Sequence, residues 1–390
     1  MTLSINSMIR STAFIFALAF LLLSMNSRTT VAAVHMESYR PHVAVFIPQN
    51  LSGKPAPLKE LRESLSRGIT SSGIPVLDNA SLERFMARHR IRYSGGLDSE
   101  SALALKSEEK IDAVLITAVE LYDENYPPKI GVIARLVSTG EGVDILWAES
   151  IAISGDDSPG ILGIGLISDP SALREKAVQS LVRSLIRHLS GEKADEKPVN
   201  RRYSPKYFYR SAAFSGDRKY TVGILPFLNA GDRKYAGEII VLHFLTELAR
   251  DGRFNVVEPG VVRQKLLNLR IVMPEGMTLT DADYITLSLK ADVVLSGTVM
   301  SYEDYSGPAG APKIDFSVTA IERMSKRMIL SSKSYNRGDD GVFFFDRGKV
   351  NTAGRLAAYM VRSLVGEISE YGKEGEPGFR DLPYSPGPVE

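Results

Sequence analysis

The residues best suited to chemistry are two pairs of adjacent aspartates, each preceded by glycine. They occur as Gly155-Asp156-Asp157 and again as Gly338-Asp339-Asp340. Carboxylate oxygens bind hard cations such as calcium and magnesium, and two neighbouring acids could also exchange protons with a substrate. Adjacent residues of a strand point to opposite faces, so the two acids could share a ligand only within a turn. Glycine and aspartate are common turn residues, and we therefore predict that each motif is a turn that ends a strand.

A second candidate site consists of two loops rich in tyrosine, proline and acids, at 122–128 and 302–308. Tyrosine favours binding surfaces because it offers a large contact area with a polar tip at a small entropic cost. The residues concerned are Tyr122, Tyr126, Tyr302 and Tyr305. We predict possible partner-binding loops here, and the alternative is that exposed tyrosines simply belong to long loops.

The remaining polar residues give little support for an enzyme. The chain has five histidines and no cysteine, so it offers few ligands for a transition metal. Two of the histidines, His188 and His243, fall inside amphipathic helices, where a surface or flanking role is expected. The sequence contains no nucleophile elbow, phosphate-binding loop or zinc-binding His-Glu-x-x-His helix. We predict a protein without catalytic residues, cofactor or metal; a hydrolase or metal enzyme that uses the aspartate pairs is the less favoured alternative.

Composition indicates an ordinary globular chain. It has 390 residues, 44% of them apolar, and 47 Lys+Arg stand against 46 Asp+Glu. This length suggests two domains, each large enough to bury a core, and the composition excludes disordered and fibrous classes. The balanced charge argues against a nucleic-acid partner, because such binding draws its affinity from counterion release.

The N-terminus has the pattern of a secretory signal at residues 1–33. Arg10 precedes an apolar run over 12–25, and small side chains follow at Val31-Ala32-Ala33. The run is shorter than the roughly 20 residues of a membrane-spanning helix, so an uncleaved anchor is the alternative. No cysteine follows the run, which excludes a conventional lipid anchor. We predict export to a bacterial periplasm, with association to the outer membrane left open.

Four sequence blocks occur twice, in the same order and at a nearly constant offset. The pairs are 42–48 with 221–227, 111–119 with 291–299, 155–157 with 338–340, and 182–185 with 361–364. Chance is a poor explanation for such order, and the chain is therefore predicted to contain one unit twice. We place the first copy at 40–190, a linker at 191–219, the second copy at 220–371 and a disordered tail at 372–390.

Each copy is predicted to alternate strands with helices and then to run through neighbouring strands. In the second copy, apolar residues at three- and four-residue steps predict a helix over 237–248 with one buried face. The spacing Thr280-x-x-Asp283 is typical of a capping box that begins a further helix. The fold class expected is α/β: two tandem α/β sandwich domains, each a mixed β-sheet packed with helices.

These residues resemble the CsgG-like and TolB N-terminal-like domains of bacterial envelope proteins. The second copy carries most of the resemblance, at Ile224–Asn229, Phe254–Glu258, Leu266–Arg270 and Ala291–Tyr302. The first copy matches best at Arg135–Glu141 and the following Leu146-Trp147. The resemblance implies an envelope protein, because such domains serve in secretion channels, in accessories of β-propeller proteins and in activators of cell-wall synthases.

The function expected is a non-enzymatic, exported module for interaction or assembly in the periplasm, near the outer membrane. Its partners would be other envelope proteins or further copies of itself. The alternative is an oligomeric subunit of an outer-membrane secretion channel, as the resemblance implies. The stretches at 160–167 and 342–345 could be membrane-inserting hairpins or partner contacts, but they lack the alternation of polar and apolar residues found in membrane barrels. We predict that each is a packed connection into the last helix of its copy.

Overall fold

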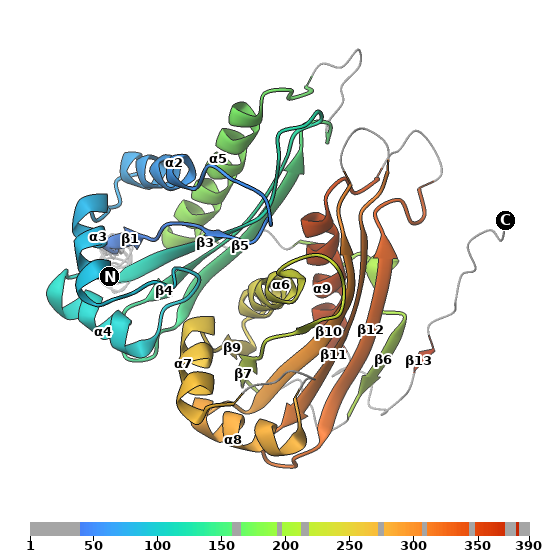
Figure 1. Ribbon diagram of the computed structural model, residues 1–390. Coiled ribbons are helices and arrows are strands. Elements are labelled where there is room, and N and C mark those ends of the chain that lie inside the picture. Colours follow the sequence, from blue (N-terminus) through green and yellow to red (C-terminus); the bar gives the residue numbers. More distant parts are fainter. Residues whose placement is uncertain are drawn as a thin grey trace, which may run out of the picture. The chain divides into compact units, whose positions relative to one another are not determined.

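The computed structural model describes residues 40–157, 165–192, 197–211, 218–271, 277–305, 310–342, 348–370 and 380–381 (Figure 1). The predicted signal peptide at 1–33 lies outside these ranges. So do the predicted tail at 372–390, apart from residues 380–381, and most of the two glycine-rich or aromatic stretches at 160–167 and 342–345.

The first repeat is a mixed sheet in the order β1-β3-β4-β5, in which β2 also pairs with β3. Its strands are β1 (Val43–Val45), β2 (Gln49–Asn50), β3 (Ala113–Asp123), β4 (Lys129–Ser138) and β5 (Ile145–Ser154). Its helices are α2 (Leu58–Ser71), α3 (Asn79–Arg88), α4 (Ser99–Glu108) and α5 (Pro170–Leu189). β1 runs parallel to β3, and β3, β4 and β5 form antiparallel hairpins.

The second repeat has the same plan and a wider sheet, in the order β13-β6-β12-β11-β10-β7-β9, with β8 paired to β10. Its own strands are β7 (Tyr220–Ile224), β8 (Leu228–Asn229), β9 (Phe254–Val256), β10 (Val293–Glu303), β11 (Lys313–Glu322) and β12 (Met328–Arg337). Its helices are α6 (Ala236–Arg250), α7 (Pro259–Leu269), α8 (Leu279–Leu289) and α9 (Ala353–Glu370). The predicted α/β class, with a mixed sheet and packed helices in each repeat, is therefore confirmed.

Small details show that the two repeats are equivalent. The Asn50 side chain donates to the carbonyl of Lys54 over 2.8 Å, and the Asn229 side chain donates to the carbonyl of Arg233 over 2.7 Å. The central hairpins carry a bulge at the same place, after Val119 in one repeat and after Val299 in the other. These matches fix which position of one repeat corresponds to which position of the other.

Part of the predicted linker belongs to the second sheet. β6 (Tyr207–Arg210) pairs antiparallel with β12, and β13 (Arg380–Asp381) pairs with the far side of β6. A short 3-10 helix, η2 (Arg201–Tyr203), precedes β6. In the first repeat β5 corresponds to β12, and among the described residues no strand equivalent to β6 follows it in the sheet.

The predicted capping box is wrong by two residues. The side-chain oxygen of Thr278 accepts from the backbone N–H of Asp281 over 3.1 Å, and α8 begins at Leu279. The reason lies in the sequence, where the Thr-x-x-Asp spacing occurs in two overlapping registers and the earlier one forms the cap.

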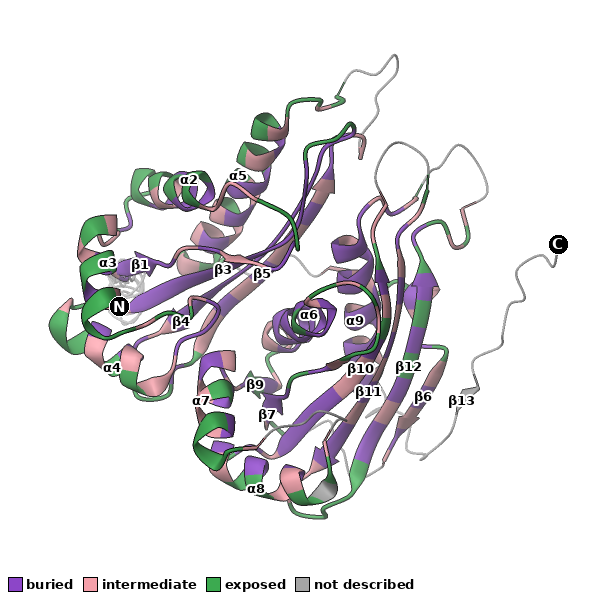
Figure 2. Cartoon of the chain, in the orientation of Figure 1, coloured by how far each residue is buried: buried purple, intermediate pink, exposed green. Residues whose placement is uncertain are grey.

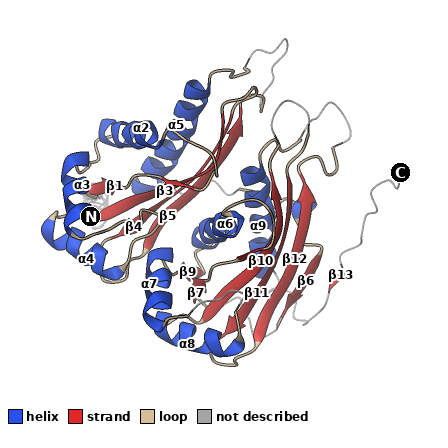
Figure 3. Ribbon diagram, in the orientation of Figure 1, coloured by secondary structure: helices blue, strands red, loops and turns tan. Residues whose placement is uncertain are grey.

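The two repeats share one core. α2 and α5 cover one face of the first sheet, and α6 and α9 lie between the two sheets (Figure 3). Ala118 and Ile133 of the first repeat therefore pack in one cluster with Ile239 and Phe244 of α6. Figure 2 shows the consequence: α6 is buried on all sides, whereas α2 keeps an exposed outer side.

Candidate functional site

Several buried or half-buried polar side chains, most of them charged, lie where the face of β3, β4 and β5 meets α6, α7 and α9. We call this region the joint. It comprises Glu120, Lys129, Arg135, Glu149, Asp156, Asp157, Arg233, His243, Glu258, Tyr302, Asp304 and Arg355. The charges have partners from both repeats, so the joint is held by more than apolar packing.

The most buried ion pair of the joint connects β4 with the start of α7. Arg135 Nε donates to Glu258 Oε2 over 2.8 Å, and Arg135 Nη2 donates to Glu258 Oε1 over 2.7 Å. The side chains are 2% and 0% exposed. Arg135 also donates to the carbonyl of Gly95, and Glu258 accepts from the backbone N–H of Leu97. Burial alone would lower the pKa of Arg135, but the facing Glu258 carboxylate raises it, so Arg135 stays charged.

The backbones of the two repeats almost touch beside this ion pair. A Cβ added to Gly260 would lie 2.4 Å from backbone atoms of Leu97, and one added to Gly96 would lie 2.7 Å from the backbone nitrogen of Gly260. No side chain fits at such distances. Glycine is therefore required at both positions by the close approach of the chains.

A second buried cluster lies at the centre of the joint. Nε2 of His243, on α6, is 2.8 Å from Oε2 of Glu120, on β3, and both side chains are almost fully buried. The hydroxyl of Tyr302 donates to the same carboxylate oxygen over 3.4 Å. Arg233 donates to the carbonyls of Ser52 and Glu120. The expected surface or flanking role for His243 is thus wrong, because α6 is covered on both sides.

This central cluster is not fully hydrogen-bonded. Within the described part of the chain, Glu120 Oε1 and His243 Nδ1 are buried and have no hydrogen-bond partner. The same holds for Asp304 Oδ2, although the other oxygen of Asp304 accepts from the backbone N–H of Ala353 over 2.9 Å at the start of α9. Burial raises the pKa of Asp304 to about 6, even with Lys129 and Arg233 nearby.

Lys129 ties β4 to the loop that follows β10. Its Nζ donates to the carbonyl of Tyr305 over 2.7 Å and lies 3.4 Å from the centre of the Tyr305 ring. This geometry combines a charge-assisted hydrogen bond with a cation–π contact. Burial lowers the pKa of Lys129, and the neighbouring Asp304 acts in the opposite direction.

The repeated Gly-Asp-Asp motif forms the same turn twice. Asp157 accepts from the backbone N–H of Ser154 over 2.9 Å, and Asp340 accepts from that of Arg337 over 2.8 Å. A Cβ on Gly155 would lie 2.0 Å from a carbonyl oxygen, and one on Gly338 would lie 2.3 Å from its counterpart. In each copy the glycine permits the close approach and the third residue caps the end of the strand.

Among the residues that the structure describes, the first copy of the motif contacts the other repeat and the second does not. Arg355, on α9, donates to Asp157 over 2.7 Å, and Asn351 donates to Asp156 and Asp157 over 3.3 Å each. In the second copy, Asp339 pairs with Arg337 inside its own turn. No cluster of three potential metal ligands is present among the residues that the structure describes.

The four tyrosines of the predicted binding loops occupy different surroundings. Tyr126 is 55% exposed. Tyr122 is buried, donates to Glu124 over 2.9 Å and has its pKa raised to about 12, chiefly by burial. Tyr302 is buried in the joint, and Tyr305 contacts Lys129. A partner in solution would therefore meet Tyr126 but not Tyr122 or Tyr302.

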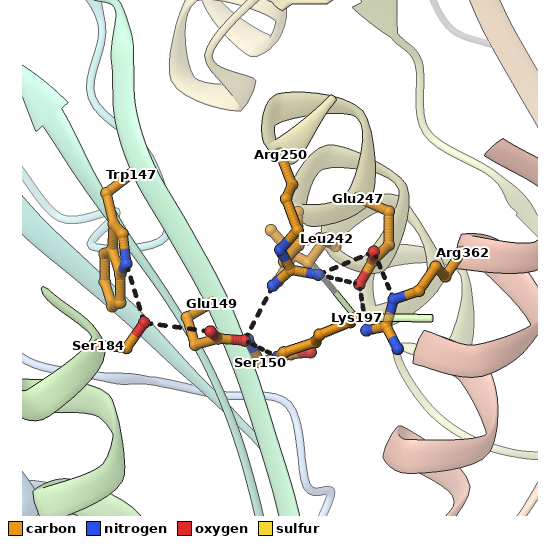
Figure 4. A network of polar contacts seen from close by, with 10 residues as sticks. Trp147, Glu149, Ser150, Ser184, Lys197, Leu242, Glu247, Arg250 and Arg362 are labelled. Atoms are coloured by element: carbon orange, nitrogen blue, oxygen red, sulfur yellow. Dashed lines mark hydrogen bonds and ion pairs between the residues drawn. The ribbon is translucent and has the colours of Figure 1, made fainter. Parts of the chain in front are cut away.

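A chain of ion pairs runs along one side of the joint (Figure 4). Glu149 on β5 accepts from Lys197 over 2.7 Å and from Arg250 over 3.0 Å. Arg250 continues to Glu247, which Arg362 of α9 also contacts. Burial would raise the pKa of Glu149, but the two cations lower it. The network joins the first sheet, the linker and the helices α6 and α9 of the second repeat.

One sequence signal for the joint was available. Residues 239–245 of α6 are all apolar except His243, so this stretch of the helix has no polar side. A helix that is apolar all round is buried on all sides. The prediction of one buried face captured the contact with the second sheet and missed the contact with the first.

Comparison with known proteins gives no family. No protein-family model matches the chain, and no curated protein matches it significantly. Among the described residues, no helix has the length and apolar character needed to cross a bilayer.

Several solved structures are similar to part of the chain. The PelC dodecamer from Paraburkholderia phytofirmans is 12% identical, with 42% of this chain and 94% of that chain covered and a TM-score of 0.29. Lipoprotein GNA1162 from Neisseria meningitidis is 22% identical, with 36% and 99% covered and a TM-score of 0.26. The LpoB C-terminal domain from Escherichia coli is 18% identical, with 30% and 82% covered and a TM-score of 0.23. All three are bacterial proteins, but TM-scores of this size establish neither a shared fold nor a shared function.

Proposed function

We propose that the chain is a non-enzymatic module for interaction or assembly in the bacterial cell envelope, exported to the periplasm and working near the outer membrane. The joint is the observation that carries the proposal. Its contacts use the polar residues most suited to chemistry, such as Asp156, Asp157 and His243, to hold two repeats together. The pattern of a secretory signal supports the proposed location.

A fixed tandem unit is suited to binding. Two repeats that share a core present their loops in one arrangement, and a preorganised surface loses less entropy on association. Tyr126 is the predicted contact residue that this arrangement leaves exposed. We therefore expect a partner protein of the envelope to meet the loop at 122–128.

The test is photo-crosslinking in cells that express the full chain. A photoreactive residue is placed at Tyr126, with Tyr284 as the control because it is 61% exposed and lies on α8 in the other repeat. Cells are fractionated, and the N-terminus of the purified chain is read by mass spectrometry. A periplasmic chain that starts near Val34 and crosslinks an envelope protein from 126 but not from 284 is expected. A cytoplasmic location, or equal crosslinking from both positions, would overturn the proposal.

The absence of catalysis is tested separately. Asp156→Asn combined with Asp339→Asn removes one charge from each aspartate pair. We expect the double variant to keep the crosslinking pattern of the parent, and calorimetry with calcium and magnesium to show no binding heat. Loss of function with retained folding, together with heat on metal addition, would instead indicate an enzyme or metal-binding protein.

A further inference from the structure

We infer that the joint is a head-to-tail contact made within one chain, and that the remaining surfaces cannot repeat this contact with a second copy. The contact is asymmetric, because repeat 1 contributes its sheet face and repeat 2 contributes its helices α6 and α9. Each repeat has both kinds of surface. The sheet face of repeat 2 and the helix face of repeat 1 are therefore left over, and such a contact could in principle continue from chain to chain as a ring or filament.

The leftover sheet face has lost its apolar character. Ala118 pairs with Ile133 on the used face, and both are buried in the shared core. The same register places Thr298 opposite Ser317 on the leftover face, where both are half-buried. Thr298 and Ser317 carry hydroxyl groups at the positions of the apolar residues Ala118 and Ile133. Covering this face would therefore desolvate polar groups without the free energy gained by burying apolar surface.

The leftover surfaces have also lost the ion pair. Thr319 occupies the position of Arg135. The first residue of β3 pairs with Ser138 and the first residue of β10 pairs with Glu322, and Arg135 and Thr319 each lie three residues before these partners. Asp78 occupies the position of Glu258 at the start of α3, is exposed, and caps its own helix by accepting from Ser81 over 2.9 Å. Neither end can form the buried Arg–Glu pair with another copy.

The close backbone approach is blocked as well. Gly260 is the second residue of α7, and Ala80 is the second residue of α3. A Cβ at the Gly260 position would lie 2.4 Å from the facing backbone. The methyl group of Ala80 would make the same clash with a second copy.

The outer side of α2 differs from that of α6 in the same sense. The matching asparagine loops before these helices align Glu60 and Glu63 of α2 with Ile239 and Leu242 of α6. The two glutamates are exposed, whereas the two apolar residues are buried in the joint. Packing α2 under another sheet would bury two uncompensated carboxylates. These four independent features prevent a second copy from binding at either leftover surface. The inference concerns assembly and does not rest on the proposed function.

Engineered cysteines test the inference, because the chain has none of its own. Asp78→Cys with Thr319→Cys places thiols on the two leftover surfaces, which can meet only between chains arranged head to tail. Asp156→Cys with Asn351→Cys is the matched control inside the joint, where the parent side chains are 3.3 Å apart. Under mild oxidation we expect the control variant to form an internal disulfide. The variant with Asp78→Cys and Thr319→Cys, called the end pair, should stay as single chains. Covalent ladders from the end pair, beyond those of either single cysteine variant, would overturn the inference.

A gain-of-contact variant tests the equivalence of the surfaces. It combines Thr319→Arg, Asp78→Glu, Ala80→Gly, Thr298→Ala, Ser317→Ile, Glu60→Ile and Glu63→Leu in the full chain. The control keeps the four apolar replacements but leaves Thr319, Asp78 and Ala80 unchanged. Light scattering should give one-chain mass for the parent at all concentrations and concentration-dependent growth for the full variant, well beyond that of the control. A folded full variant that stays at one-chain mass, or a parent that forms rings, would contradict the inference.

Discussion

Two parts of the joint differ in how completely their charges are paired. At the start of α7, Arg135 and Glu258 use two parallel hydrogen bonds and also have backbone partners. At the centre, Glu120, His243 and Asp304 each keep a buried atom without a partner among the described residues. A fully paired cluster adds geometric specificity, whereas a partly paired one keeps a cost of burial that changes with protonation. The first part fixes the two repeats, and the second contains Asp304, whose pKa is raised to about 6 by burial, so its protonation changes with pH.

The largest expected effect comes from breaking the paired part. Arg135→Met leaves the Glu258 carboxylate buried and alone, and we expect a loss of about 3–5 kcal/mol in the free energy of unfolding, measured by urea denaturation. The double variant Arg135→Met with Glu258→Leu removes both charges and should regain much of the loss. Arg88→Ala is the control, because its ion pairs are more exposed. A single variant as stable as the double would refute this view of the pair.

The partly paired region should reveal itself through pH. The folded pKa of Asp304 is raised to about 6 from 3.8, so the native state binds a proton that the unfolded chain has released. Stability from this group therefore rises as pH falls from 7 through the folded pKa, and it levels off once the pH lies below the unfolded pKa of 3.8. The full effect is about 3 kcal/mol. The free energy of unfolding of the parent and of Asp304→Asn, compared at each pH, isolates the contribution of Asp304. If the two curves of stability against pH are parallel, the prediction is wrong.

The close backbone contact can be broken by one methyl group. Gly260→Ala should lower stability by about 1–3 kcal/mol, because neither backbone can retreat without disturbing the ion pair beside it. Gly252→Ala is a matched control, since a Cβ there has no atom within 4 Å. Thermal unfolding of both variants measures the difference. Equal melting temperatures would show that the two repeats separate more easily than the structure implies.

The smallest effect should distinguish the two copies of the turn motif. Asp157→Asn removes the negative charge that pairs with Arg355 of the other repeat. Asp340→Asn changes the equivalent turn, whose Asp340 has no ion pair with the other repeat among the described residues. Because the Arg355 side chain is partly exposed, the extra loss for Asp157→Asn should be only about 0.5–1 kcal/mol and should shrink at high salt. Identical losses in low salt would mean that the turn alone accounts for the first motif as well.

Local patterns predicted the fold better than the joint. The repeat, the strands of the central hairpins and the closing helices follow from periodicity within each copy. Arg135 and Glu258 were also visible as motif residues, but nothing local shows that they pair with each other across repeats. Their contact depends on how the sheet of one repeat packs against the helices of the other. Local sequence patterns do not contain this information.

The tyrosines show a second limit of sequence patterns. The sequence pattern predicts loops at Tyr122 and Tyr302, but β3 and β10 continue through them. A bulge after Val119 and after Val299 shifts the alternation, so that Val299 and Tyr302 point to the same buried face. Bulges leave little trace in a single sequence, and alternation counted without them assigns the wrong face beyond the extra residue.

The shared core also sets an order of events during synthesis. The chain emerges from its N-terminus, so all strands of the first sheet exist before α6 and α9 have been made. Until then, the sheet face with Ala118 and Ile133 lacks the helices that later cover it. Nascent chains halted between the repeats should therefore be cleaved by protease faster than completed chains, and equal rates would argue against this order. The first repeat therefore has to be made with its joint face uncovered, and it reaches its final packing only when the second repeat is complete.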